Sequence, residues 1–294
     1  MTRKIMVATD FSTRSDRALR RATLLARSTS SRLVLVHVVD DDRPARLVEV
    51  SQREATIVLT ELARTVHEVD GVPCDAKVML GEPFQCLSDA AEEFDVALTV
   101  MGPYRRQALR EMFMGTTVDR TIRRSRRPIL MANAVPSRPY QRIVIATDFS
   151  ESSIHALNAA RDLDLCRDAE IILLHVFDAP ARGMMFGAAL PQDQIKDYIV
   201  EEERSAANRM VEFIGQVGFK PKRQILKLAE EPVGTIIKDC ARHERADLIV
   251  VGTRGQSGLE TLLLGSVAEG VLQGSEVDVL AVPLPHASGQ EEQP

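Results

Sequence analysis

Short runs of apolar residues alternate with longer amphipathic stretches along the chain. The runs are rich in Val, Ile and Leu, and they lack the strict alternation with polar residues that marks a half-exposed strand. Such runs are typical of strands buried on both faces, as in a parallel sheet with helices on both sides. In the second half of the chain they are residues 143–146, 171–176, 225–228, 248–251 and 277–282.

The stretches between these runs have the apolar period of helices. Residues 154–163 carry apolar side chains near helical spacing, and Ser152 or Ser153 is the expected N-cap. Residues 198–214 form a longer amphipathic stretch, and the acidic residues near its start favour a helix N-terminus. Strands joined by helices through right-handed crossovers predict a doubly wound α/β fold.

The sequence is internally duplicated. Residues 5–12 reappear at an offset of 138 positions, with Ala-Thr-Asp-Phe-Ser identical, whereas Gly102 corresponds to Gly252 at an offset of 150. The second repeat therefore carries a net insertion of 12 residues, which we place in residues 178–194. The centre of that segment, residues 183–190, is too apolar for an ordinary exposed loop. A lid over a ligand, a dimer contact and packing between domains are all open interpretations.

Repeats of this length are domains rather than solenoid units. We predict two tandem doubly wound α/β domains, residues 1–135 and 141–285, each with about five mainly parallel strands flanked by helices. Residues 133–140 contain two prolines and predict a stiff linker. The polar residues 286–294 predict a disordered tail.

Composition excludes several classes of protein. The chain has 294 residues, of which 45% are hydrophobic and 27% charged, as in ordinary globular proteins. No run of eighteen apolar residues exists, so no membrane span is expected. The first residues enter a strand-like run without a signal-peptide core, which predicts the cytoplasm. The four cysteines are scattered and are expected to be reduced structural thiols.

Charge is distributed unevenly between the repeats. Residues 1–138 hold 22 basic and 18 acidic side chains, a net charge of +4, and residues 139–294 hold 15 and 24, a net charge of −9. An acidic chain with 4% aromatic residues and no Trp is not expected to bind nucleic acid. The arginine-rich residues 120–127 are instead expected to face solvent or to contact the acidic repeat.

Candidate chemistry gathers at the carboxyl ends of the predicted strands of the second repeat, where open parallel sheets bind ligands. Asp148 follows the first strand and is suited to accept ribose hydroxyls or to hold a divalent ion. Residues 252–255 read Gly-Thr-Arg-Gly, and nine residues later come Gly265 and Ser266 at the start of a predicted helix. Glycines allow backbone N–H groups to approach an anion, and a helix N-terminus attracts phosphate.

These features together resemble the universal stress protein family. The resemblance rests on Ala-Thr-Asp-Phe-Ser, on the strand Leu-Leu-His-Val-Phe, and on Gly-x-x-Gly followed after nine residues by Gly-Ser, and it covers nearly all of residues 3–283. It implies that the second repeat belongs to the ATP-binding branch. Asp148 together with a bound nucleotide could recruit Mg²⁺ or Mn²⁺, which bind phosphate oxygens and one or two carboxylates. The implied ligands are Ala146, Thr147 and Asp148 for ribose and adenine, Val176 for the base, and Gly252, Arg254, Gly255, Gly265, Ser266 and Val267 for the phosphates.

The sequence departs from the family pattern at several positions. Ala146 stands where the family often has proline, and Glu230 stands where a glycine is frequent, close to the expected pocket mouth. In the first repeat Arg105 replaces the second glycine of the motif. We hypothesise that this repeat does not bind ATP in the usual way and that Arg105 or Arg106 partly fills the phosphate space. A purely structural partner domain is the alternative.

Family members dimerise through the last strand of the domain. The resemblance therefore implies a homodimer, or a pseudo-dimer of the two repeats, formed by residues 129–132 and 277–282. Covering free strand edges makes such pairing physically sensible.

Other residue clusters receive ordinary structural interpretations. His37 and His175 occupy equivalent strand positions and are expected to be hydrogen-bonded core residues rather than catalysts. Cys240 and His243 share one helix face, but two ligands do not make a zinc site. Neither a catalytic residue nor a metal site is therefore assigned.

The leading interpretation is an ATP-binding stress-response protein in which the nucleotide is a regulatory ligand with little turnover. No P-loop lysine, activated nucleophile or acid–base pair stands near the glycines. A metal-dependent ATPase or phosphotransferase that uses Asp148 and Arg254 is the enzymatic alternative. A nucleotide-free module that docks a partner is the third.

Overall fold

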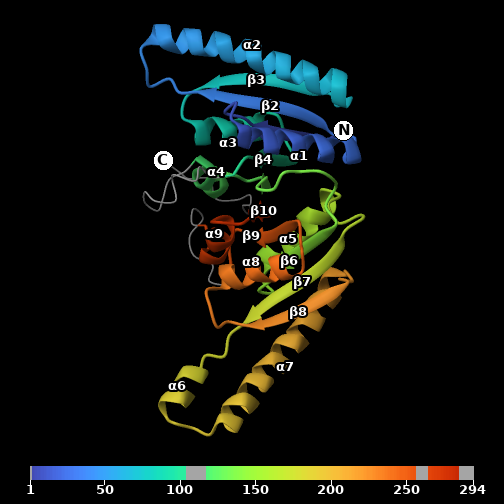
Figure 1. Ribbon diagram of the computed structural model, residues 1–294, viewed down its shortest axis with the longest axis vertical. Helices are drawn as coiled ribbons and strands as arrows, with labels where there is room; N and C mark the ends of the chain where they lie inside the picture. Colours follow the sequence, from blue (N-terminus) through green and yellow to red (C-terminus); the bar gives the residue numbers. More distant parts are fainter. Residues whose placement is uncertain (1, 104–116, 256–263, 285–294) are drawn as a thin grey trace, which may run out of the picture. The chain divides into compact units, whose positions relative to one another are not determined.

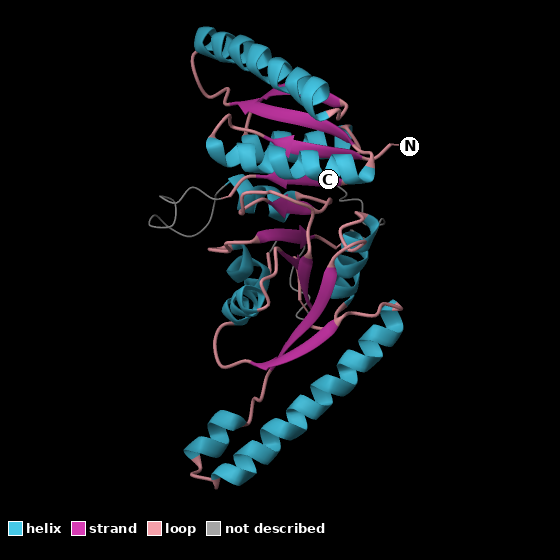
Figure 2. Cartoon of the chain, turned by 45° about the vertical axis from the view of Figure 1, so that its right-hand side comes forward, coloured by secondary structure: helices cyan, strands magenta, loops and turns pink. Residues whose placement is uncertain are grey.

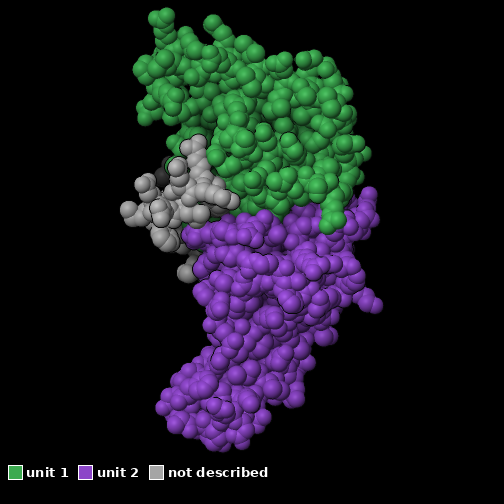
Figure 3. Space-filling view, viewed as in Figure 1, with its two compact units in different colours: residues 1–139, 259–264, 278–294 green, residues 140–258, 265–277 purple. Residues whose placement is uncertain are grey.

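The structure is a computed structural model that describes residues 2–103, 117–255 and 264–284. The chain divides into two compact units (Figure 3). Unit 1 comprises Met1–Pro139, Leu259–Leu264 and Asp278–Pro294, and unit 2 comprises Tyr140–Gly258 and Gly265–Val277. The domain bounds expected from the sequence stay a prediction, and the expected tail, residues 286–294, lies outside the described residues.

Unit 1 is built on a sheet whose strands follow the order β3-β2-β1-β4-β5-β10 (Figure 1). Neighbouring strands are parallel except for the last pair, because β10 runs antiparallel to β5. The strands are β1 (Lys4–Ala8), β2 (Arg32–Val39), β3 (Cys74–Leu80), β4 (Leu98–Met101), β5 (Ile129–Met131) and β10 (Asp278–Val282). The helices are α1 (Thr13–Thr29), α2 (Ala45–Asp70), α3 (Pro83–Glu93) and α4 (Thr117–Arg124).

Unit 2 is built on a parallel sheet in the order β9-β6-β7-β8. Helices α8 and α9 pack against each other on one face of this sheet, and α5 covers the other face (Figure 2). The strands are β6 (Arg142–Ala146), β7 (Glu170–Phe177), β8 (Arg223–Leu228) and β9 (Leu248–Gly252). The helices are α5 (Glu151–Asp162), α6 (Arg182–Gly187), α7 (Gln192–Val217), α8 (Val233–His243) and α9 (Ser266–Leu272).

The predicted fold class is confirmed. Each repeat contributes five described strands, mostly parallel, with helices between them. The apolar runs form the core: Ile143, Val144 and Ile145 of β6 are completely buried, as the absence of alternation predicted. The carboxyl ends of β6, β7 and β9 therefore meet at one edge of unit 2 and bring the predicted ligands together.

The last strand of the second repeat lies in unit 1, where a buried ion pair fixes it. Arg21 of α1 donates from Nε to Asp278 Oδ2 at 2.8 Å and from Nη1 to the carbonyl of Arg138 at 2.9 Å. The backbone N–H of Ala134 donates to Asp278 Oδ1 at 3.0 Å. Both charged side chains are almost fully buried, and buried charges require such pairing. The pair thus holds β10 and the inter-repeat segment against α1.

The start of α5 differs from the sequence prediction. Ser150 is the N-cap rather than Ser152 or Ser153, and its side chain accepts a hydrogen bond from the N–H of Ser153. The reason is the preceding turn: Phe149 has a φ of 66°, which reverses the chain early and begins the helix at Glu151. Helix α7 is also longer than residues 198–214, since it runs over Gln192–Val217.

The structure locates most of the insertion. Five residues, 40–44, separate β2 from α2, whereas fourteen residues, 178–191, separate β7 from α7. Nine of the twelve extra residues therefore lie where the sequence placed the insertion, and they include the short helix α6. The side chains of Met184 and Phe186 on this helix are 73% and 54% exposed in the described chain.

Candidate functional site

The tip of β6 is a tightly hydrogen-bonded turn that presents a carboxylate. The Thr147 hydroxyl donates to Ser153 Oγ at 2.9 Å and accepts from the N–H of Phe149 at 2.9 Å. Asp148 Oδ1 accepts from both the N–H and the hydroxyl of Ser150, at 3.1 and 2.5 Å. These bonds fix the Asp148 carboxyl group, and its Oδ2 lies on the side of Gly255, in the segment after β9 that we call the glycine loop (residues 252–255).

His175 fixes the same turn from β7. Its Nδ1 donates to the carbonyl of Thr147 at 2.8 Å, and its ring lies 4.1 Å from that of Phe149. Burial lowers the pKa of His175; the Thr147 carbonyl and Asp148 raise it, and the charge of Arg209 lowers it further. His175 is therefore a hydrogen-bonded core residue, as the sequence predicted.

The glycine loop meets the carboxylate directly. A Cβ on Gly255 would lie 3.3 Å from Asp148 Oδ2, so a side chain here would occupy the space in front of the carboxylate. Gly265 closes the loop from the other end, because its N–H donates to the carbonyl of Thr253 at 2.8 Å. A Cβ on Gly265 would lie 3.3 Å from that same carbonyl oxygen. Gly255 thus lies against Asp148, and Gly265 lies against Thr253.

Gly252 has a different reason to be glycine. A Cβ at this position would lie 2.4 Å from Ser152 Oγ and 3.1 Å from the Ser152 carbonyl oxygen. Contacts this short force the backbone or the serine to move. The close approach of β9 to α5 accounts for this glycine independently of any ligand.

The other predicted ligands lie at the same edge. Ala146 is the last residue of β6 and is in register with Leu174, two residues before Val176 in β7. Ser266 and Val267 are exposed and begin α9 directly after Gly265. Arg254 is partly buried within the loop. Direct proximity is shown for Asp148 with Gly255 and for Gly265 with Thr253 and Arg254. The predicted ligand set as a whole stays a prediction.

Two residues of α7 also belong to this region and were missed from the sequence. The Arg209 guanidinium lies 4.8 Å from the centre of the Phe149 ring, and the Phe213 ring lies 5.6 Å from it. The helical period predicted an amphipathic stretch, but it gave no signal that this stretch reaches the strand tip. These side chains hold the Phe149 ring over His175.

A family model described as the universal stress protein family matches residues 1–133 and again residues 139–283. The chain belongs to this family. Universal stress protein A homolog 2 of Coxiella burnetii is 34% identical over 145 residues, which cover 49% of this chain and 94% of that protein. Universal stress protein Rv2005c of Mycobacterium tuberculosis is 23% identical over 296 residues, 94% of this chain and 95% of that protein.

Solved structures show the same double architecture. The functionally unknown protein PA1789 from Pseudomonas aeruginosa has a TM-score of 0.70 at 22% identity and covers 96% of this chain and 92% of its own. A universal stress protein from Archaeoglobus fulgidus has a TM-score of 0.67 at 20% identity, with 95% and 98% covered. These likenesses establish the fold of both repeats.

The first repeat of this universal stress protein carries the same tip. Asp10 Oδ1 accepts from the N–H and the hydroxyl of Ser12, and His37 Nδ1 donates to the carbonyl of Thr9 at 2.8 Å. Arg14 differs from its counterpart in the second repeat and forms an ion pair with Asp10 at 3.3 Å. The hypothesis that Arg105 or Arg106 fills the phosphate space concerns positions outside the described residues.

Glu230, expected to place a negative charge near the pocket mouth, has a partner. It forms an ion pair with Arg182 of α6 at 2.8 Å. The partner's opposite charge reduces the repulsion that Glu230 alone would exert on an anion, although exposed pairs of this kind are weak.

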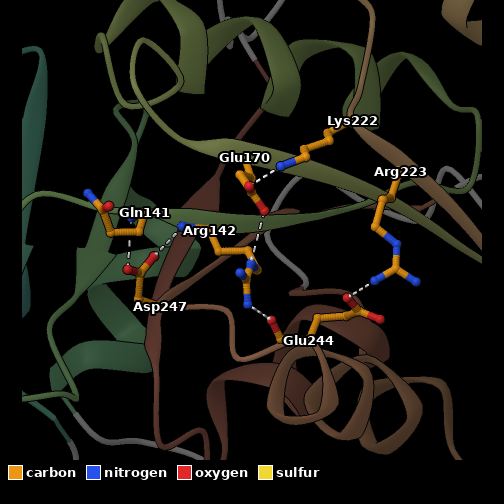
Figure 4. A network of polar contacts seen from close by, with 7 residues as sticks. All are labelled: Gln141, Arg142, Glu170, Lys222, Arg223, Glu244 and Asp247. Carbon is orange, nitrogen blue, oxygen red and sulfur yellow. Dashed lines mark hydrogen bonds and ion pairs between the residues drawn. The ribbon is translucent and has the colours of Figure 1, made fainter.

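A polar network lies at the amino ends of the unit 2 strands, opposite the Asp148 tip (Figure 4). Arg142 donates from Nε to Glu170 at 3.3 Å and from Nη1 to the carbonyl of Glu244 at 2.6 Å. The hydrogen bond from Lys222 and the nearby Arg142 hold the pKa of Glu170 below its usual range. A hollow of about 340 Å³ is lined by Arg142, Glu170, Ile172, Arg223, His243, Glu244 and Arg245.

The charges of this network pair with each other. Arg223 is bound to Glu244 and Lys222 to Glu170, while Asp247 accepts from the backbone N–H groups of Gln141 and Arg142. The cations and carboxylates thus pair with one another and connect the first residues of the strands to the end of α8. We read this cluster as structural.

Two features of the described residues are relevant to other functions. Across residues 2–103, 117–255 and 264–284, no helix is both long and apolar enough to cross a membrane. In that same part of the chain, no three His, Cys, Asp or Glu side chains gather as a candidate metal site. The expected cytoplasmic location, dimerisation and lack of nucleic-acid binding stay predictions.

Proposed function

We propose that this universal stress protein binds ATP at the carboxyl ends of β6, β7 and β9 and uses it as a regulatory ligand with little turnover. The observation that carries the proposal is the meeting of Gly255 with Asp148, where a Cβ would stand 3.3 Å from the carboxylate oxygen. Two segments more than a hundred residues apart thus meet at a carboxylate that Ser150 anchors.

The residues present suit a nucleotide. Asp148, held by Ser150, can accept hydrogen bonds from ribose hydroxyls, and the exposed Gly255 and the half-buried Gly265, which lack side chains, would allow phosphate oxygens to approach the backbone. Val176, partly exposed at the end of β7, offers its backbone to the base. Ala146 and Thr147 would form the floor beneath ribose and adenine, and Arg254, Ser266 and Val267 would complete the phosphate side.

Chemistry at this site would be slow. The groups of the site are a carboxylate, an arginine, a serine hydroxyl and backbone amides, and we propose no activated nucleophile among them. Mg²⁺ or Mn²⁺ recruited by Asp148 and the phosphates would neutralise charge. We therefore expect hydrolysis slower than about 0.1 per second, below the ordinary enzyme range.

Mass spectrometry of nucleotide released from the purified chain, together with titration calorimetry with ATP, tests the proposal. The Gly265→Glu variant places a carboxylate where phosphates would lie, so affinity should fall at least about 100-fold through charge repulsion and lost space. Gly183→Glu on α6 is the matched control, because a side chain there meets nothing within 4 Å.

The control variant should bind ATP as the unchanged protein does. If the unchanged protein neither retains nor binds an adenine nucleotide, the proposal is wrong. Equal affinity of Gly265→Glu and Gly183→Glu would show that ATP binds elsewhere.

A further inference from the structure

The unit 2 sheet ends in a strand with one face partly open. Among the described strands, β8 pairs with β7 alone and is the last in the order of the sheet (Figure 1). Helix α8 packs over β7 and β9, and a hollow of about 570 Å³, which we call the β8 groove, lies between β8 and α8. Ile225 of β8 and Ile236 of α8 line this groove and are only half-buried. A strand edge beside an apolar groove is an arrangement that accepts an extended peptide as an added strand.

The β8 groove joins the hollow of the polar network at the start of β8 (Figure 4). Both are lined by Arg223, His243 and Glu244. The network hollow, of about 340 Å³, adds Arg142 and Arg245. One end of a polypeptide that lies along β8 would therefore reach these arginines.

Charge differs between the two hollows, with histidine counted as neutral. Apart from the ion pair of Arg223 with Glu244, which both share, the network hollow is lined by two arginines and Glu170, a net charge of +1. Lys222 binds Glu170 from outside this lining. The β8 groove has, apart from the shared pair, a net charge of −2 from Lys227, Glu230, Glu231 and Asp239. The combined site is thus positive at the start of β8 and negative towards its end.

Arg245 is the cation of the network hollow that other side chains leave available. It follows α8 in the left-handed conformation, with a φ of 53°, and within the described residues its side chain forms no hydrogen bond or ion pair. The matching residue of unit 1, 150 positions earlier, is Asp95, which has a φ of 47° and pairs with Arg127. Asp247, two residues after Arg245, accepts from backbone N–H groups and does not line the hollow. The same turn therefore carries a paired acid in one repeat and an available cation in the other.

We propose that the β8 groove binds the carboxyl-terminal segment of a partner protein as an extra strand antiparallel to β8, with the terminal carboxylate at Arg245. Arginine binds carboxylates through charge-assisted hydrogen bonds, and Arg223 and Arg142 stand beside it. The six residues of β8 span about 20 Å, so six or seven peptide residues fill the site. Alternate side chains of the peptide then point towards Ile225 and Ile236.

The charges of the site decide the direction of the peptide. In the antiparallel direction the terminal carboxylate lies at the positive end of the site, and the preceding residues lie along the negative groove. The parallel direction would place the carboxylate near Glu230 and Glu231, where like charges repel. The carboxylate end of the site lies opposite the Asp148 tip, so this inference does not depend on nucleotide binding.

Selection from a library of random heptapeptides with free carboxyl ends, using the full-length protein, supplies the probe. We expect enriched peptides with apolar residues at alternate positions and a basic residue towards the amino end. One enriched peptide is then made with a free carboxyl group and as the terminal amide, and fluorescence anisotropy gives both affinities. The free acid should bind at least about tenfold more tightly. Failure to enrich any peptide, or equal affinity of acid and amide, would overturn the proposal.

Arg245→Asn tests where the carboxylate binds, because asparagine tolerates the left-handed backbone but carries no charge. Binding of the acid should weaken at least about fivefold and that of the amide by less than about twofold, so the ratio of the two affinities falls. Arg27→Asn, at an exposed arginine near the end of α1, is the control and should leave the ratio in place. An acid-to-amide ratio that stays the same in Arg245→Asn would refute the assignment. Circular dichroism and urea unfolding report whether each variant keeps its fold.

Two further measurements address the groove and the strand pairing. Ile225→Thr keeps a β-branched residue in β8 but removes apolar contact, and it should weaken acid and amide alike by about threefold or more. Methylation of successive peptide nitrogens should give large and small losses in alternation, because every second N–H of an added strand faces β8. Equal losses at all positions would contradict pairing with β8 and overturn the proposal, as would full affinity in Ile225→Thr.

Discussion

The tips of β1 and β6 differ by no more than 0.2 Å in their shared hydrogen bonds, yet they present different chemistry. In both, a threonine, a phenylalanine, a serine and a histidine from the next strand build the turn. The identical Ala-Thr-Asp-Phe-Ser segments therefore encode the shape of the turn. The residues around the turn differ: Arg14 forms an ion pair with Asp10 in one repeat, and Gly255 lies against Asp148 in the other.

A second pair of matching positions shows how the repeats solve one packing problem differently. Phe84 and Arg120 join α3 to α4, with the guanidinium 3.7 Å from the ring centre. The matching residues in unit 2 are Gly234 and Gly270, 150 positions later, and there the helix backbones themselves touch. A cation–π contact in one repeat thus takes the place of direct backbone packing in the other.

The largest expected effect comes from a charge pair that has no counterpart in the second repeat, where Ala159 stands in place of Arg21. Arg21→Met leaves Asp278 buried without its cation, which should lower the free energy of unfolding by about 3–5 kcal/mol. Urea unfolding followed by circular dichroism measures the change.

The exposed neighbour Arg20 supplies the control, and Arg20→Met should change stability by less than about 0.5 kcal/mol. Replacing both members of the pair, Arg21→Met with Asp278→Leu, should recover part of the loss because no unpaired charge remains buried. Equal stability of Arg21→Met and Arg20→Met would show that the pair does not hold β10.

A smaller loss is expected where the helix backbones touch. A Cβ on Gly234 would lie 2.8 Å from the carbonyl carbon of Gly270, so Gly234→Ala should cost about 1–3 kcal/mol by forcing α8 and α9 apart. Gly215→Ala in α7 meets nothing within 4 Å and should instead stabilise the protein by up to about 1 kcal/mol through helix propensity.

Thermal or urea unfolding of the two variants compares them directly. The substitution is the same in both variants and only the surroundings differ. Changes of opposite sign in the free energy of unfolding would therefore show the cost of close packing at Gly234. A stabilising Gly234→Ala would mean that α8 and α9 can move apart to admit a side chain. The matching helices of unit 1, α3 and α4, do carry side chains at these positions, Phe84 and Arg120.

The sequence predicted the features that depend on local pattern. Uninterrupted apolar runs predicted buried parallel strands, and the rule that carboxyl ends of parallel strands share one edge predicted that Asp148 and Gly255 would meet. Both segments carried recognisable chemistry, an acid after a strand and a glycine in a turn. The comparison of the two repeats also predicted the insertion, most of which the structure places between β7 and α7.

The features that were missed depend on contacts between distant residues or on backbone geometry. Arg21 and Asp278 are 257 positions apart, and the local sequence around either residue gives no indication of its partner. The N-cap was placed two or three residues beyond Ser150 because the positive φ of Phe149 cannot be inferred from a pattern of apolar residues. Arg14 was overlooked because arginine on a helix normally faces solvent, and only the turn before it brings Asp10 within reach.

The smallest expected effect concerns the histidine behind the Asp148 turn. His175 is buried with a lowered pKa, so the folded protein resists its protonation while the unfolded chain accepts a proton near the ordinary value of 6.5. The unfolded state thus binds more protons below that pH, and stability should decline as pH falls from about 7 through 6.5 and onward to the folded pKa. Asp148 and Arg209 are the charged groups that face the ring, with opposite effects on its pKa.

His175→Asn keeps a side-chain N–H that can donate to the Thr147 carbonyl but removes the titration. The variant should therefore show a shallower loss of stability between pH 7 and pH 5 than the unchanged protein, with a modest loss at pH 7 from the smaller side chain. Urea midpoints at half-unit pH intervals measure both slopes. Identical slopes would mean that the pH dependence arises from other groups, such as His155, whose pKa burial also lowers. The pH dependence of stability would then come from residues outside the turn at the end of β6. The two repeats would in that case share the geometry of the turn but no pH response that arises from it.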